Sequence, residues 1–133
     1  ELADFFSLTP QEQITYAFHD SAAAPDPTQL PQQARDIQAA NAATLAVYAR
    51  EPYMHDPKLR RRLALVPTPV AVLWGVSDRI APEPYGRAYA DSFPHARFEP
   101  IREAGHLPHL EQPQQVLEAI RRFADETTRS TAR

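Results

Sequence analysis

The sequence predicts an α/β protein in which a helical N-terminal segment precedes two parallel strands with flanking helices. In residues 1–65, apolar residues recur at three- and four-residue spacing, which is typical of amphipathic helices. From residue 66 the pattern changes to two strand-like segments, the first a short continuous apolar run, separated by a helical stretch. We therefore expect a helical segment over 1–65 and an α/β segment over 66–133. The length of 133 residues allows one domain or a piece of a larger one.

Three helices are expected in residues 1–65. The first begins where Thr9 caps it, a proline occupies the first helical position and Glu12 completes a capping box, and it runs to about residue 19. Residues 20–30 are proline-containing loop. A helix from 31 to about 50 follows, and a short third helix starts after the capping residue Asp56. On the second helix, Ile37, Asn41, Leu45 and Tyr48 recur at three- and four-residue spacing and so share one face.

The remaining elements alternate between strand and helix. Residues 69–74 form a continuous apolar run that suits a strand buried on both faces, with helices above and below the sheet. Residues 82–92 read as a helix and 96–101 as a second strand, which together make one right-handed crossover unit. A last helix spans 113 to about 125. Its apolar stripe is Val116, Leu117, Ile120 and Phe123.

Two parallel strands with these helices would make a poor core. The first strand has a neighbour on one side, so its other edge presents unpaired backbone groups. We therefore expect further strands to come from outside these residues. The chain begins with Glu1 rather than methionine, in the helical segment. Our interpretation is that the chain is a piece of a larger protein, cut in or near this segment, where exposed loops favour nicking.

Composition argues against several classes of protein. The net charge is −3 and the arginines are dispersed, which argues against a nucleic-acid partner, and the cluster Arg60–Arg62 is expected to be a solvated helix face. There is no cysteine for disulfides or thiolate metal sites, and no glycine-rich phosphate loop. No apolar run approaches the ~20 residues of a membrane span. We expect a cytoplasmic protein that neither enters a membrane nor carries a cofactor.

Two residues with acid–base chemistry follow the two expected strands. Asp78 lies just after the first strand and His106 just after the second, so both loops open on the carboxyl edge of the sheet. A carboxylate bonded to one imidazole nitrogen fixes the tautomer and stabilises the imidazolium. The other nitrogen is then free to take a proton from a nucleophile. Gly105 would let the backbone turn sharply before the histidine.

The nucleophile itself is missing from the sequence. The only glycines are Gly75, Gly86 and Gly105, so a G-x-S-x-G nucleophile elbow cannot be present. Ser77 adjoins the acid, but neighbouring side chains in a loop point apart, and we do not assign it as the nucleophile. The sequence therefore contains the acid and the base of a three-residue nucleophilic site, but not its nucleophile.

Other readings of the same residues remain open. An aspartate after a strand is commonly a turn residue or a helix cap, and Glu103 is then the alternative acid. His106, His109 and Glu111 could be drawn as a metal site, but Pro108 disfavours a regular helix there and further ligands are not evident, so no metal is assigned. Glu111 is instead expected to anchor the histidine loop by hydrogen bonds.

Two segments resemble a known superfamily. Residues 67–82, which end in Gly-Val-Ser-Asp-Arg-Ile-Ala-Pro, resemble the penultimate strand and acid loop of the α/β-hydrolases. Residues 104–113, with Gly-His followed by Glu-x-Pro, resemble their histidine loop. The resemblance implies the C-terminal portion of an α/β-hydrolase fold, with its last two strands and flanking helices, preceded by a helical cap over 1–65. The nucleophile, the oxyanion-hole loop and the first strands of that fold are absent here.

The resemblance also implies a function. An ester, amide, carbon–carbon or related bond would be cleaved by a Ser-His-Asp type triad, with His106 as base and then acid and Asp78 as its orienting partner. This chain alone would be inactive, and its partners would be a partly apolar small-molecule substrate and the missing N-terminal part or a second chain. Seven residues of the cap could line an apolar pocket, of which we expect most to be ordinary packing and one or two to touch substrate: Phe5, Phe6, Tyr16, Phe18, Tyr48, Tyr53 and Met54.

A function of a different class is a non-catalytic interaction module. The open edge of the first strand could pair with another chain by strand addition, or with a second copy. The absent elbow separates the two readings, since without a partner that carries it the polypeptide should not turn over esters.

Overall fold

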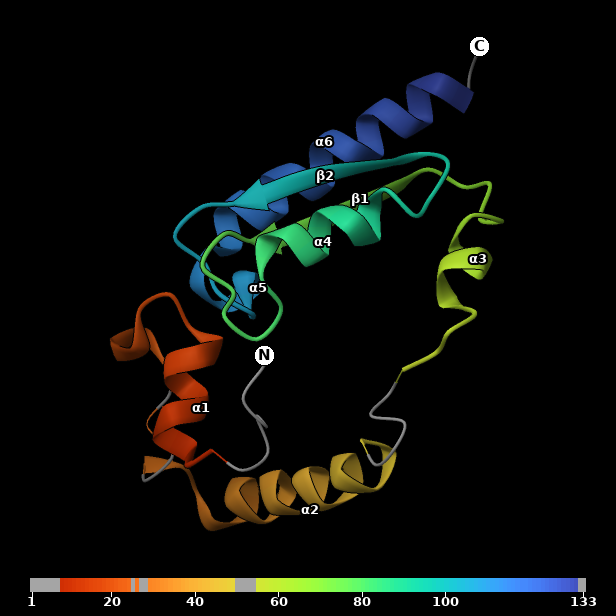
Figure 1. Cartoon of the computed structure of the whole chain (residues 1–133). Coiled ribbons are helices and arrows are strands. Elements are labelled where there is room, and N and C mark those ends of the chain that lie inside the picture. Colours follow the sequence, from red (N-terminus) through yellow and green to blue (C-terminus); the bar gives the residue numbers. More distant parts are fainter. Residues whose placement is uncertain (1–7, 25, 27–28, 50–54, 132–133) are drawn as a thin grey trace.

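The computed structural model describes residues 8–24, 26, 29–49 and 55–131, and Figure 1 shows the arrangement of its elements. In chain order the elements are α1 (Pro10–Ala17), the 3-10 helix η2 (Ser21–Ala23), α2 (Gln32–Tyr48), α3 (Leu59–Leu63), β1 (Val70–Gly75), α4 (Glu83–Ala90), β2 (Ala96–Ile101), α5 (Pro108–Glu111) and α6 (Pro113–Thr131). The helical N-terminal half and the later strand–helix–strand unit agree with the expected α/β class.

The two strands form a parallel pair. Val70 is opposite Ala96 and Gly75 is opposite Ile101, so both strands end at the same edge. In Figure 1, α4 lies in front of this sheet and α6 behind it. Successive side chains of β2 alternate between these helices: Phe98 lies under the Arg87 guanidinium of α4, whereas the Arg97 guanidinium lies over a ring of α6.

The α4 face is fixed by a tryptophan on β1. The Trp74 ring lies against Gly86, where a Cβ would come 2.7 Å from ring atom Cε2. The indole N–H of Trp74 donates to the Ala81 carbonyl, 2.9 Å away, in the loop that leads into α4. The ring thus joins the strand, the loop and the helix, and it sets how close α4 can approach.

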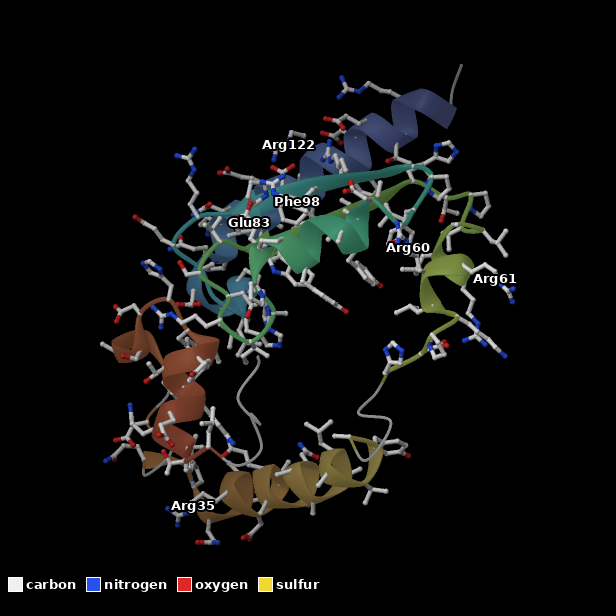
Figure 2. All side chains as sticks on the ribbon, in the orientation of Figure 1. Arg35, Arg60, Arg61, Glu83, Phe98 and Arg122 are labelled. Atoms are coloured by element: carbon white, nitrogen blue, oxygen red, sulfur yellow. The ribbon has the colours of Figure 1, made fainter. Side chains whose placement is uncertain are left out.

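The far face of the sheet carries charged pairs against α6. Arg97 pairs with Glu126, and Glu99 pairs with Arg122, which Figure 2 labels beside α6. We expected β1 to be buried on both faces. Val72 and Gly75 are buried, but the other residues of this strand are half-buried. A second strand on one side, and two helices, leave the sheet partly uncovered.

Two expected apolar stripes differ from the packing. Among the α6 residues whose burial is described, Ala119 is buried and Val116 and Phe123 of the expected stripe are half-buried, whereas Leu117 is 38% and Ile120 is 52% exposed. On α2 none of the side chains described is buried, and Tyr48 is 74% exposed. Figure 1 shows α2 lying away from the sheet, so its stripe has no sheet surface to pack on.

The expected N-terminal cap of α1 is confirmed, and the one expected for α3 is wrong. At α1 the Glu12 N–H donates to Thr9 Oγ1 at 3.3 Å and the Thr9 N–H donates to the Glu12 carboxylate at 2.8 Å, which completes the capping box. At α3 the cap position is Lys58, without a side-chain cap. Asp56 accepts the Lys58 N–H at 2.8 Å and pairs with Arg62, so it closes the preceding turn instead.

The short helix α5 was not expected. Pro108 is expected to disfavour a helix here, but it occupies the first turn of α5, where its missing N–H is harmless. The arginines of α3 are exposed, as expected of a solvated face. In Figure 2, Arg60 points toward the strands and Arg61 points away from them.

Candidate active site

The loop after β1 holds Asp78 at the carboxyl edge of the sheet. One carboxylate oxygen, Oδ1, accepts the backbone N–H groups of Ile80 at 2.8 Å and Ala81 at 2.9 Å. The other oxygen, Oδ2, lies 2.9 Å from Nδ1 of His106. The Asp78 side chain is 4% exposed, so three bonds replace the water that burial removes.

His106 follows β2 and is held from both its backbone and its ring. Its backbone N–H donates to the Ala17 carbonyl at 2.6 Å, and its ring nitrogen Nδ1 faces Asp78. The side chain remains 43% exposed. Because the carboxylate can only accept, Nδ1 carries the proton, and Nε2 of the neutral ring is a base.

The two groups shift each other's titration. Burial raises the pKa of Asp78, but the hydrogen bonds from His106, Ala81 and Ile80 outweigh it and hold this pKa below its ordinary value. The hydrogen bond to Asp78 raises the pKa of His106, against the opposing effect of burial. The arrangement therefore favours an ionised acid beside an imidazole whose protonated form is stabilised.

The expected alternative acid, Glu103, does not pair with His106. Glu103 is exposed, and its backbone has a φ of 53°, in the left-handed region. The sharp turn expected at Gly105 is thus made two residues earlier, since no described glycine has a positive φ. Gly105 is instead required by close approach, because a Cβ there would overlap the Ala17 carbonyl oxygen and lie 3.0 Å from the His19 nitrogen.

A second histidine enters the site from the turn after α1. Nδ1 of His19 lies 2.7 Å from Oγ of Ser77, the residue before Asp78. Ser77 therefore contacts His19 rather than His106. Sequence reasoning missed this contact, because 58 residues separate the two and no local pattern joins them.

Glu111 forms the hydrogen bonds expected of an anchor. Its carboxylate accepts the backbone N–H groups of Gly105 at 2.6 Å, His19 at 2.8 Å and Asp20 at 3.1 Å. These bonds join the histidine loop to the turn after α1. The expectation that Glu111 anchors the loop is confirmed.

His106, His109 and Glu111, considered above as possible metal ligands, do not come together as a metal site. His106 and Glu111 are engaged as described above, and His109 is exposed on α5. Within the described ranges, no three histidine, aspartate or glutamate side chains are grouped so that they could hold a metal ion.

In the same part of the chain, no helix combines the length and apolar character needed to cross a membrane.

Two surface grooves flank the N-terminal helices. One of about 580 Å³ runs between α1 and α2 and is lined by Ile14, Ala17 and Phe18 among others. The other, of about 390 Å³, lies between α3 and α4. Of the seven residues named as possible pocket lining, Phe18 borders the first groove. Four of the others, Phe5, Phe6, Tyr53 and Met54, lie outside the described residues.

Comparison with known proteins assigns the fold and the family. The model of the alpha/beta hydrolase family matches residues 2–119, which is most of the chain. The chain belongs to the α/β-hydrolase family. Its two parallel strands and flanking helices correspond to the C-terminal portion of that fold.

Two curated relatives illustrate the match. The chain is 31% identical over 91 residues to BpoC of Mycobacterium tuberculosis, which bears the name of a non-heme bromoperoxidase, and the match covers 59% of this chain and 35% of that protein. It is 40% identical over 65 residues to pimeloyl-(acyl-carrier protein) methyl ester esterase of Xanthomonas campestris pv. campestris, over 49% of this chain and 26% of the esterase. The matched segments thus span about a third or less of these relatives.

A solved structure shares the same fold. The crystal structure of a membrane phospholipase A, described as a bacterial virulence factor, superposes with a TM-score of 0.67 at 21% identity. The superposition covers 89% of this chain and 37% of the phospholipase chain. At this identity the likeness establishes the fold alone.

Proposed function

We propose that this chain supplies the base and the acid of a hydrolase triad, with His106 as the general base and Asp78 as its orienting partner. The observation that carries the proposal is the 2.9 Å contact between His106 Nδ1 and the buried Asp78 carboxylate, at the edge where both strands end. Membership of the α/β-hydrolase family and the esterase relative support hydrolysis as the reaction class.

In this proposal Nε2 of His106 carries out both proton transfers. Nδ1–H of His106 stays bonded to Asp78, so Nε2 takes the proton from a nucleophile hydroxyl as that oxygen attacks the substrate carbonyl. The ionised Asp78 stabilises the imidazolium that forms. Nε2 then returns the proton to the leaving group, and a water molecule repeats the cycle on the acyl intermediate.

The nucleophile must come from a segment that carries an elbow. Ser77 is directed to His19, and the sequence has no G-x-S-x-G. We propose a serine on the N-terminal part of a longer protein or on a second chain, with residues 1–65 as the helical cap over the site. The chain alone is then inactive on esters.

We propose a substrate with an apolar part. The groove between α1 and α2 is bordered by Ile14, Ala17 and Phe18, and the Ala17 carbonyl accepts the backbone N–H of His106. An apolar chain in this groove would therefore end beside the proposed base.

The decisive experiment compares His106→Ala with the unaltered sequence in a longer protein that includes an upstream G-x-S-x-G segment. The rate of hydrolysis of p-nitrophenyl esters is measured as kcat/KM. We expect a loss of at least about 10⁴-fold, because triad members act as a unit. His95→Ala is the matched control, since His95 lies on the turn before β2 and only its backbone carbonyl is bonded to Val70. Near-normal activity of His106→Ala would contradict the assignment.

A second candidate function is an interaction module. Within the described part of the chain β1 pairs with β2 on one edge only, which leaves the other edge open for strand addition. The interaction-module candidate predicts that the 133-residue chain forms a dimer whose fraction rises with concentration. The hydrolase proposal predicts that an added segment carrying the nucleophile binds at the open edge of β1. Sedimentation with and without that segment separates the two.

A further inference from the structure

A single carboxylate joins the two ends of the site. Oε2 of Glu111 accepts the N–H of Gly105, the residue before His106, and Oε1 accepts the N–H groups of His19 and Asp20 in the turn after α1. We call these three hydrogen bonds the Glu111 clasp. His19 and Asp20 lie 92 and 91 positions before Glu111 in the sequence. The clasp connects them to the loop that carries the proposed base.

Other contacts hold the end of α1 and the turn after it against both loops of the site. The Ala17 carbonyl accepts the His106 N–H at 2.6 Å, and Arg79 Nη1 donates to the Thr15 carbonyl at 2.6 Å. The His19 ring meets the Ser77 hydroxyl next to the acid. The end of α1 therefore touches the residue beside Asp78 as well as the backbone of His106.

The chemistry of the clasp requires a carboxylate. Three N–H donors converge on one side chain, and only an ionised carboxylate offers acceptors on both of its heteroatoms. A glutamine has one oxygen, and its NH₂ group would face a backbone N–H. Either Gly105 or the pair in the turn would then lose its acceptor, which is costly for a part-buried donor.

We propose that Glu111 is a positioning residue for His106, and that the clasp makes the alignment of the imidazole with Asp78 depend on docking of the turn after α1. This inference rests on the proposed role of His106 as the base. A movement of the N-terminal helical segment that opens the clasp would release the backbone of the histidine loop and with it the ring. The clasp thus couples the position of that segment to the alignment of the His106 imidazole with Asp78.

The test uses three variants of the 133-residue chain. Glu111→Gln keeps the shape of the side chain but removes one acceptor and the charge. Glu111→Asp keeps the charge and both oxygens but is one methylene too short to reach both sides. Glu118→Gln removes a charge from an exposed position on α6 and is the matched control.

The readout is the imidazole of His106 in NMR spectra recorded across pH. In both Glu111 variants we expect the Nδ1–H proton that is bonded to Asp78 to exchange faster with water. We also expect the pKa of His106 to fall toward its ordinary value, because the contact with Asp78 that raises it is loosened. A fall in Glu111→Asp cannot arise from a lost charge. Glu118→Gln should leave both quantities unchanged.

The outcomes separate this inference from the proposed function. If the Glu111 variants lose on the order of 5 °C in Tm while the His106 proton and titration stay as in the unaltered chain, the clasp only holds the loop and the inference is wrong. If the unaltered chain shows no protected Nδ1–H and no raised pKa for His106, the Asp78–His106 pair itself is absent, which overturns the proposed function together with the inference.

Discussion

Gly75 and Gly105 lie against each other where the two strands of the sheet end. A Cβ on Gly75 would overlap the carbonyl oxygen of Gly105 and lie 2.6 Å from that of Ala104. The acid loop leaves β1 at Gly75, and the histidine loop passes through Gly105. This backbone contact brings the two loops close enough for Asp78 to reach His106.

The close approach predicts a large loss of stability for Gly75→Ala. The methyl group would meet backbone atoms that cannot rotate away, so the two loops must separate. We expect the free energy of unfolding to fall by about 3 kcal/mol, at the upper end of the range for overpacked sites. Urea denaturation followed by circular dichroism measures it.

Gly86→Ala is the comparison for that prediction. Its Cβ would meet the ring of Trp74, a side chain, and alanine stabilises a helix by about 1 kcal/mol relative to glycine. We expect a smaller loss than for Gly75→Ala. An equal or greater loss at position 86 would show that the contact between the loops is not the tighter constraint.

Asp78→Asn should lower the turnover of the longer protein by about 10⁴-fold, as expected when a triad loses its orienting acid. The kcat/KM profile should also move to lower pH, because the hydrogen bond to Asp78 raises the pKa of His106 and the amide cannot replace the charge. Ester hydrolysis measured from pH 5 to 9 tests both effects.

Glu103→Gln is the matched control for the acid, since Glu103 lies in the same loop as His106 but does not pair with it. Its turnover should stay within about twofold of the unaltered protein, as for surface changes outside the machinery. A severe loss there, with a mild one for Asp78→Asn, would transfer the role of acid to Glu103.

Local patterns in the sequence predicted the strands and the position of the pair. Residues 96–101 form a strand as expected, and the apolar run of 69–74 differs from β1 by one residue at each end. The carboxyl ends of parallel strands meet at one edge, which is why Asp78 and His106 could be predicted to lie together. Both statements depend only on neighbours in sequence and on a general rule of topology.

Contacts between distant segments could not be predicted in this way. Nothing near His19 indicates that its ring meets Ser77, and nothing near Gly105 indicates that the end of α1 occupies the space of its Cβ. Glu111 was expected to anchor its own loop, but its bonds to the turn after α1 depend on the tertiary fold. The short helix at Pro108 is not predicted because proline disfavours a helix interior, although the first helical turn tolerates it.

The left-handed backbone at Glu103 predicts a stabilising substitution. A non-glycine residue in this region pays about 1–2 kcal/mol, and glycine avoids that penalty but loses more entropy on folding. We expect Glu103→Gly to raise the free energy of unfolding by up to about 1 kcal/mol. Glu103→Ala, which keeps the strain and removes the carboxylate, is the control. Equal stability of the two variants would contradict the explanation.

The opposed pKa shifts of the pair predict how stability depends on pH. The pKa of Asp78 is lowered, so its contribution is present above the unfolded value near 3.8 and is lost as pH falls through the folded pKa. The pKa of His106 is raised, so its contribution is present below the unfolded value of 6.5 and is lost as pH rises through the folded pKa. The pair therefore stabilises the fold most between these two unfolded values.

Urea midpoints measured from pH 3 to 9 test this prediction. The difference in midpoint between the unaltered chain and His106→Gln should be largest between pH 4 and 6.5, since both charges are present there. It should shrink toward acid as Asp78 is protonated and toward alkali as His106 loses its proton. His95→Gln, which keeps the pair, should retain the alkaline decline of the unaltered chain. A difference for His106→Gln that does not change with pH would mean that the ring stabilises the fold by packing rather than by its charge.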